Sequence, residues 1–409
     1  MEPPILAQGA RNPYHRAMQH ERISASIVTV AIAGVCAFLN LYAPQPVLPL
    51  LAGIFHVSAA QISATVSAST IGVAAAAPFA GMIADRFGRK TVIVVSLFGL
   101  AASTALTVTA SSLGAIVFWR FATGVFTPGI IASVLAYIAE EWSSGGATQA
   151  NAIYVAGTVL GGFTGRMLTG VLAERGGWEF AFLVLGLATL AGAFVVLRWM
   201  PAERNFTPQS SWRRGLSDFA GHLRNPTLIA TYAVGFSVLF SLVGTFTYIT
   251  FHLAAAPYRL GPAAQGMIFF VYLLGLVITP LSGSWIQALG HHRALPLALA
   301  FSAAGVLLTL SGPLWLVIAG LALCSSGVFV CQAAASSYVG LAAKSARSAA
   351  AGLYVTFYYI GGSVGAALLG LVWGAARWPG CVALIVAIQA FAAAVALLFW
   401  RRPRQVAQA

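Results

Sequence analysis

Long apolar stretches without charged side chains dominate the chain. Asp, Glu, Lys and Arg are absent between Arg22 and Asp85, between Lys90 and Arg120, and between Arg293 and Lys344. A bilayer core about 30 Å thick needs roughly 20 apolar residues in a helix that rises about 1.5 Å per residue. Each interval therefore has room for one or more membrane-spanning helices.

Clusters of glycine, proline and serine divide these stretches and predict twelve helical spans. We expect them at residues 25–47, 64–85, 91–111, 114–138, 150–173, 178–199, 227–251, 264–289, 294–312, 314–338, 349–375 and 379–400. The break between the ninth and tenth spans depends on Gly312 and Pro313 alone. The predicted fold class is an all-α integral membrane protein with twelve transmembrane helices.

The longest polar segment divides the spans six and six. Within it, Trp212, Leu216 and Phe219 recur at helical spacing, which favours a helix on the membrane surface over a structureless linker. The predicted organisation is an N-terminal tail (1–24), a six-helix bundle (25–199), a linker with the surface helix (200–226), a second six-helix bundle (227–400) and a C-terminal tail (401–409).

Short motifs repeat between the two halves at nearly the same offset. GMIADRFGRK at 81–90 aligns with GSWIQALGHH at 283–292, an offset of 202, and GGFTGRMLTG at 161–170 aligns with GGSVGAALLG at 361–370, an offset of 200. A six-helix unit used twice is the internal symmetry of one large class of secondary transporters. We therefore expect two pseudo-symmetric bundles around a central cavity.

Composition and charge support a membrane protein. The chain is 59% hydrophobic and only 8% charged, whereas soluble domains are about a quarter charged. In a soluble protein, a net charge of +13 would suggest a nucleic-acid partner. If both termini are in the cytoplasm, 17 of the 22 basic residues lie on that side, three lie outside and two lie within spans. The net charge therefore mostly reflects the orientation of the chain in the membrane. We expect a bacterial inner membrane location and no nucleic-acid partner.

The sequence lacks the motifs of other function classes. The four cysteines all lie in apolar stretches, without a CxxC or a His/Cys metal-ligand spacing, so we expect no metal site and no cofactor. An HExxH motif is absent, and no acid with a neighbouring histidine lies at membrane depth, so a membrane enzyme is not expected.

A polar decapeptide, 81–90, lies at the inner end of the second predicted span. Its two glycines allow close backbone approach and a tight turn, and its basic residues suit a helix C-terminus. We interpret it as a latch that holds the cytoplasmic side shut and breaks when that side opens, rather than as a plain positive loop. The latch residues would be Gly81, Asp85, Arg86, Gly88, Arg89, Lys90 and, as a partner from the fourth span, Glu140 or Glu141.

The G-x-x-x-D-R-x-G-R-K pattern of this decapeptide resembles the signature of the major facilitator superfamily, and the resemblance covers nearly the whole chain. Arg120 followed by Gly124 is similar to the family's arginine–glycine motif, which is associated with proton coupling. The glycines of span five look like the motif of drug and metabolite antiporters, which has proline where Gly162 stands and glycine where Arg166 stands. Together with LYAPQPVLPLL in span one, they look closest to the bacterial sugar- and drug-efflux branch.

Arg120 and Arg166 lie inside predicted spans, each roughly 10 Å below the outer surface. An arginine at that depth costs about 2.5 to 3.5 kcal/mol on insertion scales, so it usually faces a bundle interior or a wet cavity. None of the nine acidic residues falls in the middle of the membrane. The arginines either bind carbonyl groups near glycine breaks or bind negative charge and oxygen acceptors on a substrate. His56 and His252 are candidate proton carriers or ordinary interfacial residues.

Polar and aromatic positions in the spans are the remaining candidates for a substrate site, although such residues also serve as packing. The predicted substrate-binding or coupling residues are Arg120, Arg166, Asn40, Gln45, Tyr154, Phe236, Tyr248, Gln332, Tyr354 and Tyr358. The small-residue spacing of Gly157, Gly161 and Gly165 predicts close helix packing and, in a transporter, a rocking interface between the halves.

The sequence thus predicts a secondary active transporter that works by alternating access. Proton entry would drive efflux of a small organic solute such as a drug, sugar or metabolite. We expect a monomer in contact with membrane lipids. The alternative is an organic-anion exchanger or uniporter whose site is lined by Arg120 and Arg166.

Overall fold

The computed structural model describes residues 13–142, 144–204, 206, 219–343 and 345–400, and their regular structure is helical. The first half contains α1 (Pro13–Leu41), η1 (Gln45–Val47), α2 (Leu48–Ile54), α3 (Ala59–Ile62), α4 (Ala64–Phe87), α5 (Arg89–Leu106), η2 (Thr107–Thr109), α6 (Leu113–Glu141) and α7 (Ser144–Trp199). The second half contains α9 (Pro226–Ala254), α10 (Pro262–Ile268), η3 (Phe269–Leu273), α11 (Leu274–Leu289), α12 (His291–Leu308), α13 (Leu314–Ala342) and α14 (Arg347–Phe399).

The helices account for the twelve predicted spans. In the described residues, nine helical segments are long and apolar enough to cross a membrane. Two of them, in α7 and α14, contain a residue with positive φ, Gly177 and Arg377, where the chain leaves helical geometry and a second span begins. Helix α12, which starts with two histidines and an arginine, is the remaining predicted crossing. The all-α, twelve-helix fold class is confirmed.

Local chemistry sets several helix ends. Helix α1 begins at Pro13, so the predicted tail is partly helical, and it ends at Leu41 rather than at residue 47. Pro44 and Pro46 explain the early end, because proline lacks the N–H that an α-helix requires and restricts the residue before it. Helix α9 begins where the side chain of Asn225 accepts a hydrogen bond from the N–H of Thr227 at 3.0 Å.

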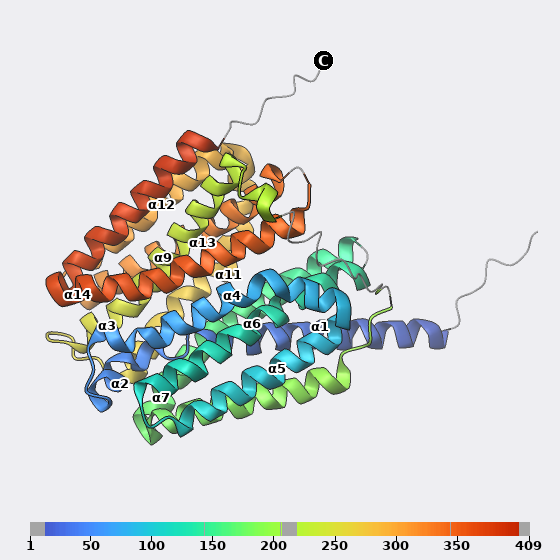
Figure 1. The fold of residues 1–409 in the computed structure, drawn as a ribbon, viewed down its shortest axis with the longest axis horizontal. Helices are drawn as coiled ribbons and strands as arrows, with labels where there is room; N and C mark the ends of the chain where they lie inside the picture. Colours follow the sequence, from blue (N-terminus) through green and yellow to red (C-terminus); the bar gives the residue numbers. More distant parts are fainter. Residues whose placement is uncertain (1–12, 143, 205, 207–218, 344, 401–409) are drawn as a thin grey trace, which may run out of the picture.

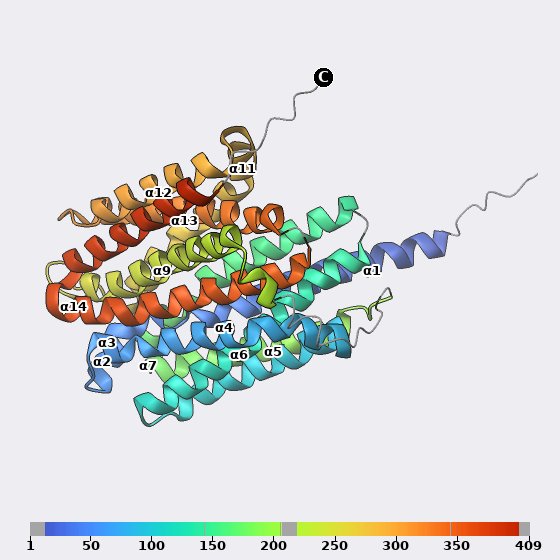
Figure 2. The same ribbon diagram turned by 45° about the horizontal axis from the view of Figure 1, so that its top comes forward.

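The two halves form two groups of helices with matching internal contacts (Figures 1 and 2). Helix α1 packs against α7 in the first half, and α9 packs against α14 in the second. A tyrosine ring covers a glycine in both pairs: Tyr154 lies against Gly34, and Tyr354 lies against Gly235. Equivalent contacts at equivalent positions are what the sequence repeat predicts.

The ends of the bundle differ in how the halves meet. We call them the Arg89 end, which contains the α4–α5 turn, and the Glu174 end, which contains α2, α3 and the start of α10. In both views α14 runs alongside α4, and α7 contacts α10 and η3 (Figures 1 and 2). Toward the Glu174 end, the hydroxyls of Ser67 and Ser363 each donate to the other residue's carbonyl oxygen, at 3.0 and 3.1 Å.

Two further contacts join the halves at the Glu174 end. The carboxylate of Glu174 accepts a hydrogen bond from the N–H of Ala263 at 2.9 Å, next to the start of α10. The hydroxyl of Tyr248 donates to the carbonyl oxygen of Ala366 at 2.7 Å and lies 2.9 Å from the hydroxyl of Ser63 in the first half. We refer to these contacts together as the Glu174-end closure.

The predicted role of the span-five glycines as a rocking interface is wrong. A side chain at Gly157, Gly161 or Gly165 would collide with the backbone of α1, so the three glycines pack α7 within the first half. They share one face of α7 because they are four residues apart, and that face is turned to α1. Gly170 is the glycine of this helix that meets the second half, at Pro262.

The linker is described only in part. Residues 207–218, which contain much of the predicted surface helix, lie outside the described residues. Residues 219–222 are helical, and the ring of His222 lies 3.1 Å from the carbonyl oxygen of Ala346 at the start of α14. The prediction of a surface helix therefore remains a prediction.

Candidate functional site

The α4–α5 turn is built around Gly88. Its φ of 91° is a conformation that residues with a side chain rarely adopt, and it ends α4 and starts α5 without an intervening loop. Arg89 follows this turn as the first residue of α5, and its Nη1 reaches the carboxylate of Asp85 in the last turn of α4. Gly88 thus has the role that the sequence predicted for it.

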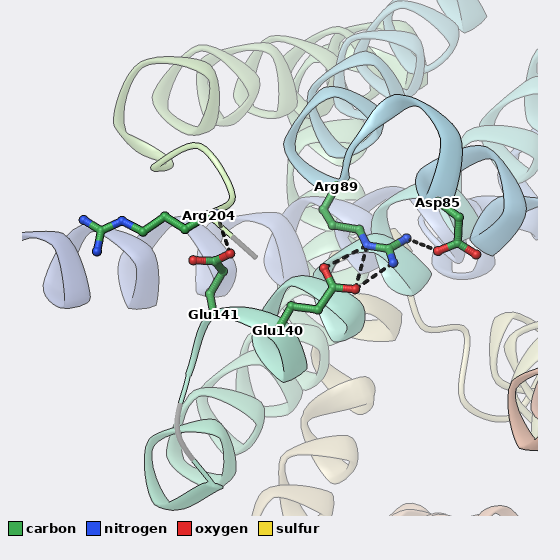
Figure 3. Close-up of polar contacts among 5 residues, drawn as sticks. All are labelled: Asp85, Arg89, Glu140, Glu141 and Arg204. Carbon is green, nitrogen blue, oxygen red and sulfur yellow. Dashed lines mark hydrogen bonds and ion pairs between the residues drawn. The ribbon is translucent and has the colours of Figure 1, made fainter. Parts of the chain in front are cut away.

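Arg89 binds two carboxylates (Figure 3). Its Nη1 lies 2.6 Å from Asp85, while its Nε and Nη2 donate to the two oxygens of Glu140 at 3.2 and 2.7 Å. Paired donors on a carboxylate are among the stronger hydrogen-bond arrangements in proteins. The predicted contact with Glu140 is present, and we call Asp85, Arg89 and Glu140 the Arg89 cluster.

The Arg89 cluster differs from the predicted latch in two respects. All three members come from α4, α5 and α6, so in this structure the cluster joins helices of the first half and does not tie the halves together. Arg86 is exposed over the ring of Phe87, and no ion pair is found for Arg86 or Lys90 among the described residues. The short turn at Gly88 restricts the pairing to side chains facing α6.

The predicted close approach at Gly81 is also absent. A side chain there would meet nothing within 4 Å, and the same is true of its repeat partner Gly283. Both glycines lie near the Arg89 end, where the halves are not in contact at these positions. Close packing at Gly81 is therefore not a property of this conformation.

The start of the linker lies against the Arg89 end. The hydroxyl of Tyr137 donates to the carbonyl oxygen of Pro201 at 3.0 Å, and the N–H of Arg204 donates to the carboxylate of Glu141 at 2.7 Å (Figure 3). The ring of Phe206 lies 5.8 Å from the guanidinium carbon of Arg89. Glu141, the alternative partner for Arg89 in the sequence, thus binds the linker instead.

Arg120 is completely buried on α6 and holds the end of α1. Its Nη2 lies 2.7 Å from the carbonyl oxygens of both Asn40 and Leu41. These carbonyls carry the partial negative charge of a helix C-terminus, which a cation stabilises. The arrangement matches the structural alternative from the sequence, in which Arg120 binds carbonyl groups at a helix break.

Asn40 has a matching structural position. Its side-chain nitrogen donates to the carbonyl oxygen of Cys36 at 2.9 Å and to the hydroxyl of Thr189 at 2.8 Å. It is fully buried, and its partners all belong to the first half. Asn40 therefore fixes the last turn of α1 to the second span of α7.

Arg166 lies where the two halves meet. It is 3% exposed, its Nη1 donates to the carbonyl oxygen of Gly162 at 2.5 Å, and its Nε donates to the side chain of Gln45 at 2.7 Å. Three rings surround the guanidinium carbon, each with its centroid 4.8 Å away: Tyr42, Phe269 and Tyr272. No ion pair of Arg166 is found in the described part of the chain.

Gln45 links Arg166 to the second half. Its nitrogen donates to the hydroxyl of Thr247 on α9 at 3.1 Å, while its oxygen accepts from Arg166. Gln45 is 1% exposed, and it reaches both partners because α1 has ended and η1 has begun. Gln45 therefore bridges Arg166 of the first half and Thr247 of the second.

The rings of Phe269 and Tyr272 owe their position to a break in the eighth span. The predicted continuous span 264–289 contains a 3₁₀ segment, η3, at Phe269–Leu273. Side chains three residues apart are aligned in a 3₁₀-helix, so both rings face the same way. The sequence analysis did not assign Phe269 to the site; the three-residue spacing of Phe269 and Tyr272 was the available signal.

Tyrosines extend the site from Arg166 toward the Arg89 end. Tyr358 lies close enough to Tyr42, Tyr272 and Tyr354 to interact electrostatically, and its ring centroid is 5.8 Å from that of Tyr354. The hydroxyls of Tyr154 and Tyr354 are buried and make no hydrogen bond to any described residue. Buried hydroxyls usually have a partner, and these two lack one in this conformation.

The other predicted site residues are placed differently. Phe236 stacks on Phe240 with ring centroids 6.2 Å apart, and its backbone packs against Gly361. Tyr248 belongs to the Glu174-end closure. Gln332 on α13 is half-buried and makes no hydrogen bond within the part of the chain that the structure describes.

The two candidate proton carriers lie near the Glu174 end. His56 is exposed in the turn between α2 and α3. His252 stacks on Trp378 with ring centroids 5.9 Å apart. No group of three His, Cys, Asp or Glu side chains that could hold a metal ion is found among the described residues.

Comparison with known proteins gives the family. The model of the Major Facilitator Superfamily matches residues 30–261, more than half of the chain. An uncharacterized transporter of Buchnera aphidicola is 32% identical over 378 residues, covering 92% of each chain. The inner membrane transport protein YnfM of Escherichia coli is also 32% identical over 378 residues, covering 92% of this chain and 91% of the relative.

Solved structures share the fold at low sequence identity. A bacterial homolog of the human lysosomal transporter Spinster, inward-facing and unoccupied, has a TM-score of 0.75 at 14% identity and covers 96% of this chain and 98% of its own. The human organic anion transporter TETRAN has a TM-score of 0.69 at 19% identity and covers 94% and 100%. The protein is a multi-pass membrane transporter and not an enzyme; it belongs to the major facilitator superfamily.

Proposed function

We propose that this transporter exports a small organic solute, such as a drug, sugar or metabolite, that carries an anionic group and that its movement is coupled to proton entry. The observation that carries the proposal is Arg166, a buried arginine that lies where the two halves meet and has no acidic partner among the described residues. A buried charge is normally paired, so the missing partner is supplied by the cargo.

The surroundings of Arg166 suit a cargo with a flat or apolar part. Three aromatic rings surround its guanidinium group, and the tyrosine hydroxyls of Tyr154 and Tyr354 offer further polar contacts. Small-molecule sites are commonly apolar with a few well-placed polar groups. The site is built from both halves, which is what a carrier needs if the cargo is to influence their relative position.

The Arg89 end is assigned to the cytoplasm because most of the basic residues lie toward it. Both termini are then cytoplasmic, the membrane is a bacterial inner membrane, and the protein acts as a monomer among lipids. The Glu174-end closure seals the outer side, which corresponds to a conformation open toward the cytoplasm. We propose that the Arg89 cluster helps to close the cytoplasmic side when the outer side opens, through Asp85, whose side chain is 39% exposed.

Anion exchange or uniport without protons is the second candidate. It is favoured by the absence of a carboxylate from the middle of the spans, since Asp and Glu are the usual intramembrane proton carriers together with histidine. In that case Arg166 would bind the cargo, while Nη2 of Arg120 holds the carbonyl groups of α1.

The two candidates are separated by transport in liposomes that contain the purified protein. Uptake of labelled benzoate, a ring with one carboxylate, is measured with an imposed pH gradient and with counter-substrate at equal pH. A proton moving through 100 mV releases about 2.3 kcal/mol, enough to alter accumulation strongly. Flux that follows the pH gradient supports proton coupling, and flux that follows only counter-substrate supports exchange. The Arg166→Ala variant should abolish both, and retained flux would remove Arg166 from the site.

A further inference from the structure

Arg89 and Arg166 present the same edge of the guanidinium group to different partners. In Arg89, Nε and Nη2 both donate to the carboxylate of Glu140, at 3.2 and 2.7 Å. In Arg166, Nε donates to the amide oxygen of Gln45 at 2.7 Å, and Nη2 has no hydrogen bond to a described residue. The edge that holds a carboxylate in Arg89 is thus only half occupied in Arg166, by a neutral group.

A carboxylate would replace Gln45 on this edge. A carboxylate would accept two parallel hydrogen bonds from this edge and cancel the charge of the guanidinium group, whereas the amide oxygen of Gln45 accepts one and stays neutral. Nη1 would stay on the carbonyl oxygen of Gly162, so Arg166 would not need to move. The exchange therefore favours the carboxylate as long as Gln45 can leave.

Displacement of Gln45 has a consequence for the second half. The amide of Gln45 is held at one end by Arg166 and at the other by Thr247, and both Gln45 and Thr247 are buried. An amide that loses one of its two partners loses the constraint that aims its nitrogen at the other. The bond between the halves at Gln45 and Thr247 is therefore coupled to the occupancy of Arg166.

We propose that Gln45 is an internal substitute for the anionic group of the cargo: a carboxylate displaces it from Arg166, which releases Gln45 from Thr247 and loosens the Glu174-end closure. This inference rests on the proposed function, in which Arg166 binds the cargo. It assigns Gln45 to coupling and not to cargo binding. It therefore predicts that removing the Gln45 side chain strengthens anion binding instead of weakening it.

Binding of benzoate to the purified full-length protein tests the exchange, with benzamide as the neutral control of the same shape. Gln45→Ala removes the competitor, so benzoate should bind roughly fivefold tighter than to the wild type. Thr247→Val frees Gln45 without touching Arg166 and should tighten binding roughly twofold to threefold. Weaker binding in Gln45→Ala would make Gln45 a ligand of the cargo and overturn the exchange.

The separation of the halves tests the coupling. Spin labels on Ser111→Cys in the first half and Ala375→Cys in the second report the distance across the Glu174 end, because both positions are exposed and the native cysteines are buried. Benzoate, but not benzamide, should shift the wild-type distances toward longer values. Thr247→Val and Gln45→Ala should show part of that shift without benzoate and respond to it less than half as much as the wild type.

Each outcome separates the inference from the proposed function. Benzoate that fails to stabilise the wild type, or stabilises Arg166→Ala equally in a thermal-shift measurement, contradicts the anion site and the exchange together. Benzoate that binds through Arg166 while the distances stay unchanged, or while Thr247→Val behaves as the wild type, leaves the proposed function standing and overturns the exchange.

Discussion

Arg89 and Arg166 are both buried in an apolar bundle, but the chain treats their charges in opposite ways. Arg89 is 8% exposed and has two carboxylates within 2.7 Å. Arg166 is 3% exposed and is surrounded by rings, a carbonyl oxygen and an amide. The first arrangement neutralises the charge, while the second disperses it without cancelling it.

The difference indicates which arginine serves the structure and which serves the ligand. A neutralised arginine braces helices and gains little from a further anion. An arginine that lacks an acid keeps its attraction for one, and cation–π contacts stabilise it by only about 0.5 to 2 kcal/mol each. Arg120 is a third case, because carbonyl groups at a helix end provide its partial negative charge.

The largest effect is expected when the charge of Arg166 is removed. In Arg166→Ala, benzoate binding and transport should fall at least about 100-fold, which corresponds to roughly 2.7 kcal/mol. Arg166→Lys keeps a charge without the planar fork and should recover only part of the loss. Isothermal titration and liposome flux measure both variants. Equal benzoate affinities for the wild type and Arg166→Ala would contradict the assignment of Arg166, and not Arg89, to the ligand.

Arg120→Met should separate the two buried arginines of the spans. It leaves the carbonyl oxygens of Asn40 and Leu41 without their donor, so the free energy of unfolding should fall by about 2 kcal/mol. Benzoate affinity should stay within about twofold of the wild type. Thermal melting in detergent with and without benzoate gives both quantities, and a loss of affinity as large as that of Arg166→Ala would place Arg120 in the ligand site.

Gln45→Glu should give Arg166 a carboxylate partner of the kind that Arg89 has. A carboxylate in place of the amide would occupy the Nε and Nη2 edge, as Glu140 does for Arg89, and benzoate affinity should fall about tenfold. Gln45→Met, similar in size but without the amide, is the matched control and should not weaken binding. Affinity that is unchanged in Gln45→Glu would show that the cargo does not use this edge.

Glu140→Gln makes the reverse change and should have the smallest effect. The amide leaves Arg89 with one neutral acceptor and the carboxylate of Asp85, and the side chain of Glu140 is 29% exposed. We expect a loss of about 1 kcal/mol in stability and no change in benzoate affinity. Melting temperature against salt concentration is the measurement, and Glu141→Gln, next along the chain, is the control.

The sequence was sufficient for the fold and for the position of the charged groups. Charge-free stretches predicted the twelve spans, and the repeat predicted the two matching halves, because both follow from the thickness of the bilayer and from a duplicated packing pattern. The contact of Arg89 with Glu140 was predicted from their places at one end of the bundle.

The sequence was not sufficient for the partners of the buried arginines. Whether Arg120 meets a ligand or a carbonyl group depends on where α1 ends, and that point shifted from residue 47 to Leu41. The rings around Arg166 depend on η3, a local departure from α-helix that hydropathy does not detect. The role of the span-five glycines was misassigned because spacing identifies a packing face and not the helix that it meets.

The position equivalent to Gln45 in the second half is Phe246. The contacts of Tyr154 with Gly34 and of Tyr354 with Gly235 relate α1 to α9 at an offset of 201, which pairs these two residues. The ring of Phe246 packs against those of Phe269 and Tyr272, with centroids 5.6 and 4.6 Å apart, and both of these rings contact Arg166. Equivalent positions of the two halves thus serve the same arginine by different chemistry, one through an amide and the other by supporting its aromatic surroundings.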